Sequence, residues 1–128
     1  MNNEFDLDKM YCGAIRRGDI FLFDNNHLIN TQSREKAVVV LQDNILNEGL
    51  PTIVCVLIEP YKTDEDVFPN EVILKKEETG LGKDGICMLH KIITVDRINM
   101  ISKKGELSQE KLQEIYKALD INLGRFRD

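Results

Sequence analysis

Two apolar stretches decide the fold of this chain: Ala37-Val38-Val39-Val40-Leu41 and Thr52-Ile53-Val54-Cys55-Val56-Leu57-Ile58. Both are short, rich in β-branched residues and bounded by polar or turn-forming residues, which predicts two buried strands. A charged residue stands at one end of each stretch, because Lys36 precedes the first and Glu59 follows the second. If the two strands are antiparallel neighbours, these charges lie at the same rim of the sheet. They would then form either part of a site or a plain ion pair.

The sequence around these stretches predicts more strands separated by loops. Residues 42–50 and 59–70 are rich in Asn, Asp, Gly and Pro and predict surface loops. Residues 76–85 contain three glycines and must bend sharply. The further strands are expected at residues 20–23, 71–75, 86–93 and 98–104.

The clearest local signal is a helix at the end of the chain. Ser108 is a good N-cap, and Leu107 and Leu112 can form a hydrophobic staple around it. Apolar residues then recur at helical spacing until Gly124, a plausible stop. Strands followed by one helix predict an α+β, mostly β domain with a barrel-like sheet and a packed C-terminal helix.

Length and composition favour one globular domain. The chain has 128 residues, of which 42% are hydrophobic and 30% charged. We expect residues 1–15 to form an N-terminal arm and residues 16–128 the domain. No apolar stretch approaches the roughly 20 residues of a membrane span. The acidic start lacks the features of a signal peptide, so the expected location is cytoplasmic.

The sequence offers no metal site. Cys12, Cys55 and Cys87 are few and widely spaced, which argues against a disulfide framework and a structural zinc site. The acidic cluster at 64–66 lacks the spacing of a calcium loop. The glycines at 80–85 do not form a phosphate loop, since no Gly-Lys-Ser/Thr helix entry follows. We therefore expect no cofactor.

The net charge is −5, which disfavours binding of a polyanion by the whole surface. A local basic groove remains open if the fold gathers the cations. The candidates are Arg16, Arg17, Arg34, Lys36, Lys91, Arg97, Lys103 and Lys104.

Several segments together resemble one family. Arg17-Gly18-Asp19-Ile20 is similar to the opening motif of the MazF/PemK (CcdB-like) toxins of toxin–antitoxin systems. Gln32 with the apolar run that ends in Gln42-Asp43-Asn44 resembles that family's second strand, and Pro51-Thr52-Ile53-Val54 its third. The later similar segments are Gly85–Leu89, Ile92–Asp96, Gly105–Leu107 and Asn122–Gly124. The resemblance covers about residues 16–124 and rests on the order and spacing of these segments.

The resemblance implies a compact SH3-like β-barrel with helices, assembled as a homodimer. It implies a growth inhibitor that cleaves single-stranded mRNA at short sequences without a metal ion, and a cognate antitoxin that blocks the RNA groove. In such cyclising ribonucleases a base takes the 2′-hydroxyl proton, a cation stabilises the phosphorane, and an acid protonates the leaving 5′ oxygen.

The chain departs from the family pattern at the positions that carry the chemistry. The family pattern before the second strand is Gly-Ser-Glu-Gln-x-x-x-Arg-Pro, whereas this chain has Ile29–Ala37. Thr31 stands at the position of the acid, and Lys36 at that of the catalytic arginine. Glu59 stands where the family has Ser or Thr at the end of the third strand. Gln32 is retained.

Three residues are the candidates for catalysis. Lys36 can act as the phosphate cation, although its point charge cannot make the two-pronged contact of arginine. Arg34 lies two residues earlier and shares the strand face if the segment is extended. Glu59 can serve as the general base. The alternative reading is that Lys36 and Glu59 form an ion pair of little energetic value.

Four residues are candidates for substrate binding: Thr31, Gln32, His27 and His90. Thr31 and Gln32 can hydrogen-bond a backbone or a base edge, or merely close a turn. His90 titrates near neutrality and suits acid–base work, but a solvent-facing strand histidine fits the pattern as well. His27 lies in a turn-rich stretch, where a plain loop residue is the simpler reading.

Two hypotheses follow. The first is a MazF-like endoribonuclease with a rewired site. The second is a catalytically impaired MazF-like module that binds an antitoxin or another protein. The changed positions favour the second hypothesis, and the scaffold fits both.

Overall fold

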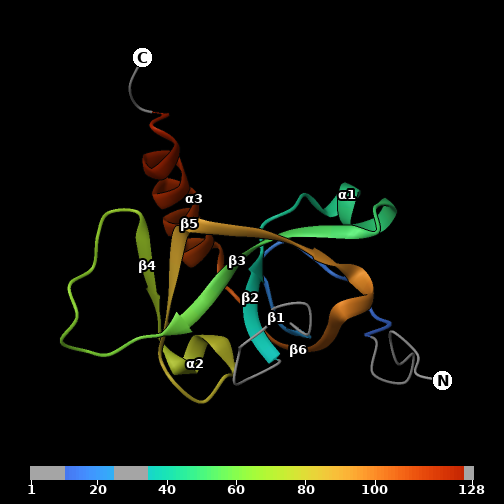
Figure 1. Cartoon of the computed structure of the whole chain (residues 1–128), viewed down its shortest axis with the longest axis horizontal. Coiled ribbons are helices and arrows are strands. Elements are labelled where there is room, and N and C mark those ends of the chain that lie inside the picture. The colour runs from blue at the N-terminus through green and yellow to red at the C-terminus, as the bar shows by residue number, and fades with distance from the viewer. Residues whose placement is uncertain (1–10, 25–34, 126–128) are drawn as a thin grey trace.

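The computed structural model describes residues 11–24 and 35–125 of the chain. Six strands and the helices of these residues follow in the order β1, β2, α1, β3, β4, α2, β5, a short 3₁₀ turn, β6 and α3 (Figure 1). The bounds of the strands are Asp19–Asp24, Glu35–Val40, Thr52–Pro60, Glu71–Leu74, Gly85–Asp96 and Met100–Glu106, and those of the helices are Asn44–Gly49, Lys76–Thr79 and Gln109–Leu123.

The strands form one antiparallel sheet in the order β4-β5-β3-β2-β1-β6. The sheet curls, so that α2, which follows the edge strand β4, lies against the opposite edge strand β6. Two glycines mark this contact: a Cβ on Gly80 would overlap the carbonyl oxygen of Lys104, and one on Gly105 would lie 2.9 Å from that of Thr79. This mostly β, barrel-like arrangement with a C-terminal helix confirms the predicted fold class.

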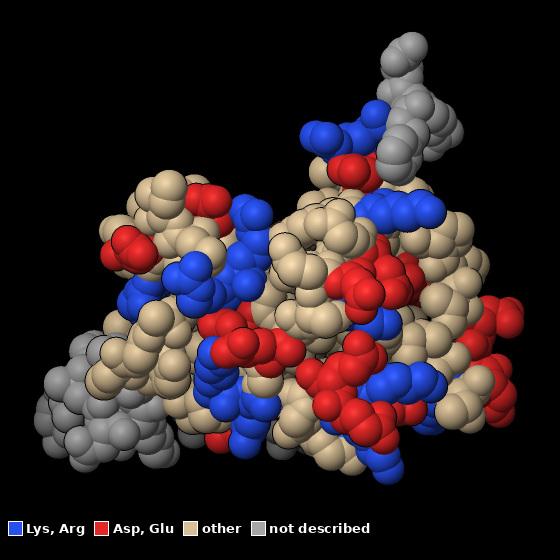
Figure 2. All heavy atoms as spheres, turned by 180° about the vertical axis from the view of Figure 1, so that it is seen from behind, with Lys and Arg blue, Asp and Glu red and all other residues tan. Residues whose placement is uncertain are grey.

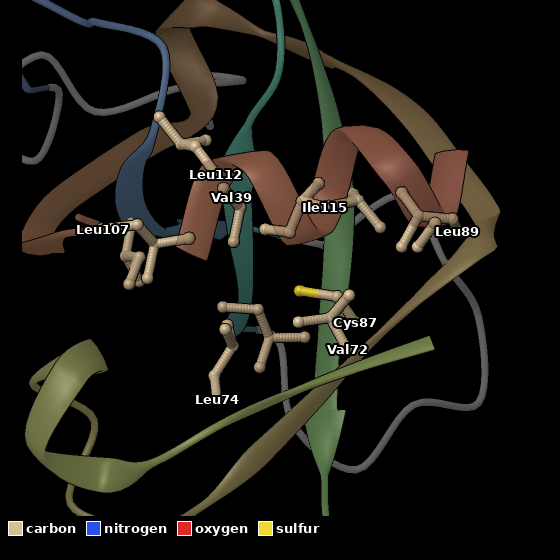
Figure 3. Close-up of a cluster of buried hydrophobic side chains, with 12 residues drawn as sticks. Val39, Val72, Leu74, Cys87, Leu89, Leu107, Leu112 and Ile115 are labelled. Atoms are coloured by element: carbon tan, nitrogen blue, oxygen red, sulfur yellow. The ribbon is translucent and has the colours of Figure 1, made fainter. Parts of the chain in front are cut away.

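The helix α3 covers one face of the sheet. Leu112 and Ile115 point from it into a cluster with Val39, Leu74 and other strand residues (Figure 3), and Ala118 belongs to the same cluster. The predicted helix signals are confirmed, because Ser108 Oγ accepts a hydrogen bond from the Lys111 N–H and Gly124 ends the helix at φ 70°.

A second buried cluster lies on the other face of the sheet. Phe21, Val38, Ile53 and Met100 belong to it, together with Ile15 from the segment before β1. Neighbouring residues of one strand thus serve different clusters: Ile20 packs towards α3 and Phe21 towards the second cluster. Burial on both faces explains why the central strands read as continuous apolar runs rather than as alternating ones.

Several expected boundaries differ from the structure, and the strand expected at 98–104 is Met100–Glu106, after a 3₁₀ turn at Arg97–Asn99. Residues 42–50 were expected to form a loop, but they contain the helix α1. Asp43 caps the start of this helix, and the fully buried Asn47 forms hydrogen bonds with Gln42. The bend at 76–85 begins with the short helix α2. The strand expected at 86–93 extends to Asp96, because β3 pairs with it along that length.

None of the helices in these ranges is long and apolar enough to cross a membrane. The division between an arm at 1–15 and a domain from residue 16 stays a prediction, although Tyr11 already packs on Phe21 with ring centroids 4.8 Å apart.

Candidate functional site

A cavity of about 470 Å³ opens where β2 begins and β3 ends. Its walls come from β1, β2, β3, β6 and the segment between α2 and β5. In Figure 1 the end of β3 and the start of β2 lie at the same end of the sheet as α2. The cavity therefore sits at one open end of the curled sheet, where five separate parts of the chain meet.

Lys36 and Glu59 both line this cavity. The strands β2 and β3 are antiparallel neighbours, and Ala37 faces Ile58 in their register. The next residues outward are Lys36 on one strand and Glu59 on the other, so the predicted meeting of the two charges at one rim is confirmed.

The alternative reading, an ion pair between Lys36 and Glu59, is not what the structure shows. Glu59 Oε2 instead lies 3.9 Å from Lys91 Nζ, which comes from β5. Lys91 reaches it because the β3–β5 register shifts between Val56 and Ile58, where β5 contains extra residues. Among the described residues Lys36 has neither an ion pair nor a side-chain hydrogen bond.

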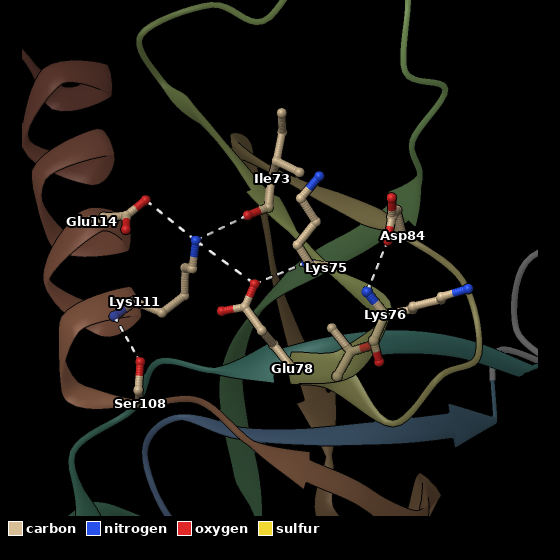
Figure 4. A network of polar contacts seen from close by, with 9 residues as sticks. Ile73, Lys75, Lys76, Glu78, Asp84, Ser108, Lys111 and Glu114 are labelled. Carbon is tan, nitrogen blue, oxygen red and sulfur yellow. Dashed lines mark hydrogen bonds and ion pairs between the residues drawn. The ribbon is translucent and has the colours of Figure 1, made fainter.

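Two further lysines face the same cavity, Lys83 from the segment between α2 and β5 and Lys104 from β6. Neither makes an ion pair or a side-chain hydrogen bond with another described residue. The acidic residues that line the cavity are Glu35, Glu59 and Asp84. The carboxylate of Asp84 is already used, because Oδ1 accepts a hydrogen bond of 2.8 Å from the Lys76 N–H (Figure 4).

Glycines shape the wall that carries Lys83. Gly80 has φ +72° and Gly82 φ +82°, a backbone region that favours glycine. The first ends α2 and lets the helix lie against β6, as described above. At Gly85 a Cβ would lie 2.5 Å from the Ile58 side chain, so the start of β5 approaches the end of β3 closely.

Lys111 fixes this wall to α3. Its ammonium group lies 3.8 Å from Glu78 Oε2 on α2 and 3.5 Å from Glu114 Oε1, and it donates a 3.3 Å hydrogen bond to the carbonyl oxygen of Ile73 on β4 (Figure 4). These contacts connect the largest helix to the edge strand and to α2. The position of the cavity wall thus depends on α3 as well as on the sheet.

His90 does not reach the cavity. It is exposed on β5, and its Nδ1 lies 3.5 Å from Nδ2 of Asn70, which also donates to Asn122 Oδ1 at 2.9 Å. Its predicted role in substrate binding stays a prediction without support from this geometry. His27, Thr31, Gln32 and Arg34 lie outside the described residues.

The two buried cysteines are not candidate nucleophiles. Burial raises the pKa of the Cys55 and Cys87 thiols to about 12, so the thiolate is scarce at neutral pH. Within the described residues no three side chains of His, Cys, Asp or Glu gather to hold a metal ion.

Sequence reasoning missed Lys83, and it named Lys91 and Lys104 only among the cations of a possible basic groove. Lys83 lies between Gly82 and Gly85, in a stretch for which the sequence predicts only a bend. A cation between glycines next to an edge strand is the signal that could have identified it as a candidate binding residue. Nothing in the sequence indicated the pair between Lys91 and Glu59. Outside the cavity the charges are mixed, and Figure 2 shows acidic and basic side chains interspersed over the face seen from behind.

Comparison with known proteins gives one family. Residues 16–123 match the model of the "PemK-like, MazF-like toxin of type II toxin-antitoxin system". A protein of Staphylococcus saprophyticus named Endoribonuclease MazF is 31% identical over 111 residues, which are 86% of this chain and 92% of that protein. The protein of the same name from Staphylococcus epidermidis is 32% identical with the same coverage.

Solved structures share the fold at lower identity. An endoribonuclease in complex with its cognate antitoxin from a mycobacterial species superposes with a TM-score of 0.71 at 20% identity, covering 87% of this chain and 96% of that one. The MazF of a MazE–MazF crystal structure from Deinococcus radiodurans gives a TM-score of 0.66 at 16% identity, covering 88% and 98%.

Proposed function

The chain belongs to the PemK-like, MazF-like toxin family of type II toxin–antitoxin systems, and from this premise we propose that it is an endoribonuclease that cleaves single-stranded RNA in the cavity between β2 and β3. Relatives about 31% identical over most of the chain carry the name endoribonuclease. The proposal places the reaction at Lys36 and Glu59 and requires no metal ion.

The observation that carries the proposal is the arrangement of these two residues. Lys36 and Glu59 both line one cavity from neighbouring strands. In the resemblance described above they take the positions of the family's catalytic arginine and of a Ser or Thr. Lys36 has no anionic partner among the described side chains, whereas Glu59 lies 3.9 Å from Lys91. A free cation beside an oriented carboxylate is a suitable arrangement for phosphate chemistry.

In the proposed reaction Glu59 accepts the proton of the 2′-hydroxyl. The 2′ oxygen attacks the phosphorus, and the ammonium group of Lys36 stabilises the extra negative charge on the phosphorane. The bond from phosphorus to the 5′ oxygen breaks, which leaves a 2′,3′-cyclic phosphate and a 5′-hydroxyl. Lys36 is also a donor in the same cavity for the proton that the leaving oxygen takes up.

The family premise also supports a protein partner. Two of the solved structures with this fold contain a toxin bound to an antitoxin, and we propose that a cognate antitoxin binds this chain and covers the cavity. We further propose that the chain acts as a homodimer in the cytoplasm, where mRNA is available.

A second candidate function is a catalytically impaired module of the same family that works by binding protein. The carboxylate of Glu59 favours it, because a negative charge in the cavity opposes the binding of phosphate. Lys36 also lacks the planar fork with which an arginine holds a phosphate. This module would bind the antitoxin without cutting RNA.

One experiment decides between the two functions. The purified full-length protein is incubated, with EDTA present, with a long single-stranded RNA, and the 5′ ends of the fragments are mapped. The endoribonuclease predicts discrete cuts that Lys36→Ala and Glu59→Ala each slow by about 100-fold or more. Lys117→Ala is the matched control, because this lysine is exposed on α3 and lies outside the cavity.

Each result has a clear consequence. Cuts that persist unchanged in both cavity variants would refute this site, although not the activity. An absence of cuts at high protein concentration would refute the endoribonuclease and leave the binding module. Toxicity in cells that depends on Lys36 would refute the binding module.

A further inference from the structure

Lys83 and Lys104 stand far from Lys36 in the sequence but line the same cavity. From this arrangement we infer that the two lysines bind the RNA phosphates on either side of the scissile one. The inference rests on the proposed function, and it adds a binding role for two residues that the family pattern above does not include.

A β-bulge sets the position of Lys104. In the pairing of β1 with β6, Ile20 faces Gly105 while Phe21 faces Lys103, so Lys104 is an extra residue without a partner on β1. Bulges turn the side chain of the extra residue away from its regular direction and are frequent next to active sites. Lys104 lines the cavity, whereas its neighbour Lys103 forms ion pairs with Asp19 and Glu106.

The glycine-containing segment sets the position of Lys83. It follows Gly82, and the contact of Gly80 with the Lys104 carbonyl joins its segment to β6. The segment that contains Lys83 is therefore held against the backbone of Lys104 through Gly80. The two cations reach the cavity from two different walls, and Lys36 from a third.

The lysines of the cavity can attract an anion, although three carboxylates line it as well. Glu59 is paired with Lys91, Asp84 Oδ1 accepts a hydrogen bond from the backbone of Lys76, and Glu35 has a contact of its own. The three lysines have no such partner among the described residues. Three cations that pair with no other described residue are suited to a chain of phosphates, which carries one negative charge per nucleotide.

The salt dependence of binding tests the inference. Affinity for single-stranded nucleic acid falls with salt with a slope of about −0.7 per phosphate contact in a double-logarithmic plot. The probe is an RNA that carries 2′-O-methyl groups throughout, so that no 2′-oxygen can attack. Its affinity is measured between 50 and 200 mM salt for the full-length protein, the double variant Lys83→Ala/Lys104→Ala and the control Lys117→Ala.

We expect the double variant to lose about 1.4 from the magnitude of the slope, whereas the control keeps the slope of the unchanged protein. When the salt concentration rises fourfold, from 50 to 200 mM, the affinity of the double variant should therefore fall by a factor about sevenfold smaller than the affinity of the unchanged protein. In cleavage assays the variant should show a raised KM, a kcat that changes little and the same cleavage positions.

An unchanged slope in the double variant would overturn the inference and leave the proposed function intact, and so would an equal change in the control. If the unchanged protein neither binds nor cuts RNA, the proposed function fails, and the inference with it. A second double variant, Lys83→Gln/Lys104→Gln, keeps polar side chains and guards against a loss of folding, which the thermal midpoint of each variant reports.

Discussion

Substitution of Gly80 by alanine tests the contact that closes the sheet. This residue has φ +72°, and an added Cβ would overlap the carbonyl oxygen of Lys104. An alanine in the left-handed region costs about 1–2 kcal/mol. The overlap adds about 1–3 kcal/mol, because two backbone segments must separate rather than a flexible side chain. Alanine also lowers the conformational entropy of the unfolded chain, which stabilises the folded state by up to about 1 kcal/mol. We therefore expect the free energy of unfolding to fall by about 3 kcal/mol.

Two other glycines are matched controls for this variant. Gly82 has φ +82° and Gly124 φ +70°, and nothing lies within 4 Å of a Cβ at either position. Gly82→Ala and Gly124→Ala therefore include only the backbone terms, and we expect each to cost about 1 kcal/mol. The difference between Gly80→Ala and these controls isolates the contact of α2 with β6.

Urea denaturation followed by circular dichroism measures the free energy of unfolding of each variant, and an unchanged m-value indicates an unchanged unfolding transition. Gly80→Ala should also weaken RNA binding, because the shift separates the segment of Lys83 from Lys104. If Gly80→Ala costs no more than Gly82→Ala, to within about 0.5 kcal/mol, the close contact between α2 and β6 is refuted.

Three further predictions concern the rest of the molecule. A thiol reagent at neutral pH should label the folded protein once, at the exposed Cys12, and the unfolded protein three times, because burial raises the pKa of the other two thiols to about 12; fast labelling of all three would contradict their burial. Lys111→Met should lower the free energy of unfolding by about 1–2 kcal/mol through the loss of its three contacts, whereas Lys117→Met should change it by less than about 0.5 kcal/mol; equal losses in denaturation would show that the contacts do not matter. Asn47→Ala should cost about 2 kcal/mol, because the buried Gln42 loses both of its hydrogen bonds to that side chain; a neutral effect would argue against the buried amide pair.

The sequence was a good guide to the strands and to α3 because their signals are local. A run of β-branched residues predicts a buried strand whichever strands it pairs with. Ser108 and Gly124 mark the ends of a helix whatever that helix packs against. The helix α1 was missed for the opposite reason. Its Asn47 is typical of a loop, and only the fold provides the buried Gln42 that satisfies it.

The same distinction holds for the cavity. Lys36 and Glu59 were predictable as neighbours because each marks the end of a strand, and antiparallel pairing of the two strands is enough to bring them together. Lys104 depends on a bulge in β6, and Lys91 reaches Glu59 through a register shift in β5. Such irregularities depend on how the whole sheet curls, which no local pattern reports.

Under the proposed function, the cavity needs more cations than Lys36 alone, which explains a binding role for Lys83 and Lys104. An arginine can hold a phosphate through two parallel hydrogen bonds, whereas Lys36 offers a single compact charge. With a net charge of −5, the protein as a whole repels RNA, so attraction must come from cations close to the bound strand. Lys83 and Lys104 line the cavity from two further walls, and under the inference above they share with Lys36 the binding of a phosphate chain that one lysine alone holds poorly. Replacing Lys36 by arginine while the other two lysines are removed therefore tests whether one forked cation can substitute for several point charges. Recovery of RNA binding in that triple variant would support this explanation, and continued weak binding would show that contacts along the strand matter more than the fork.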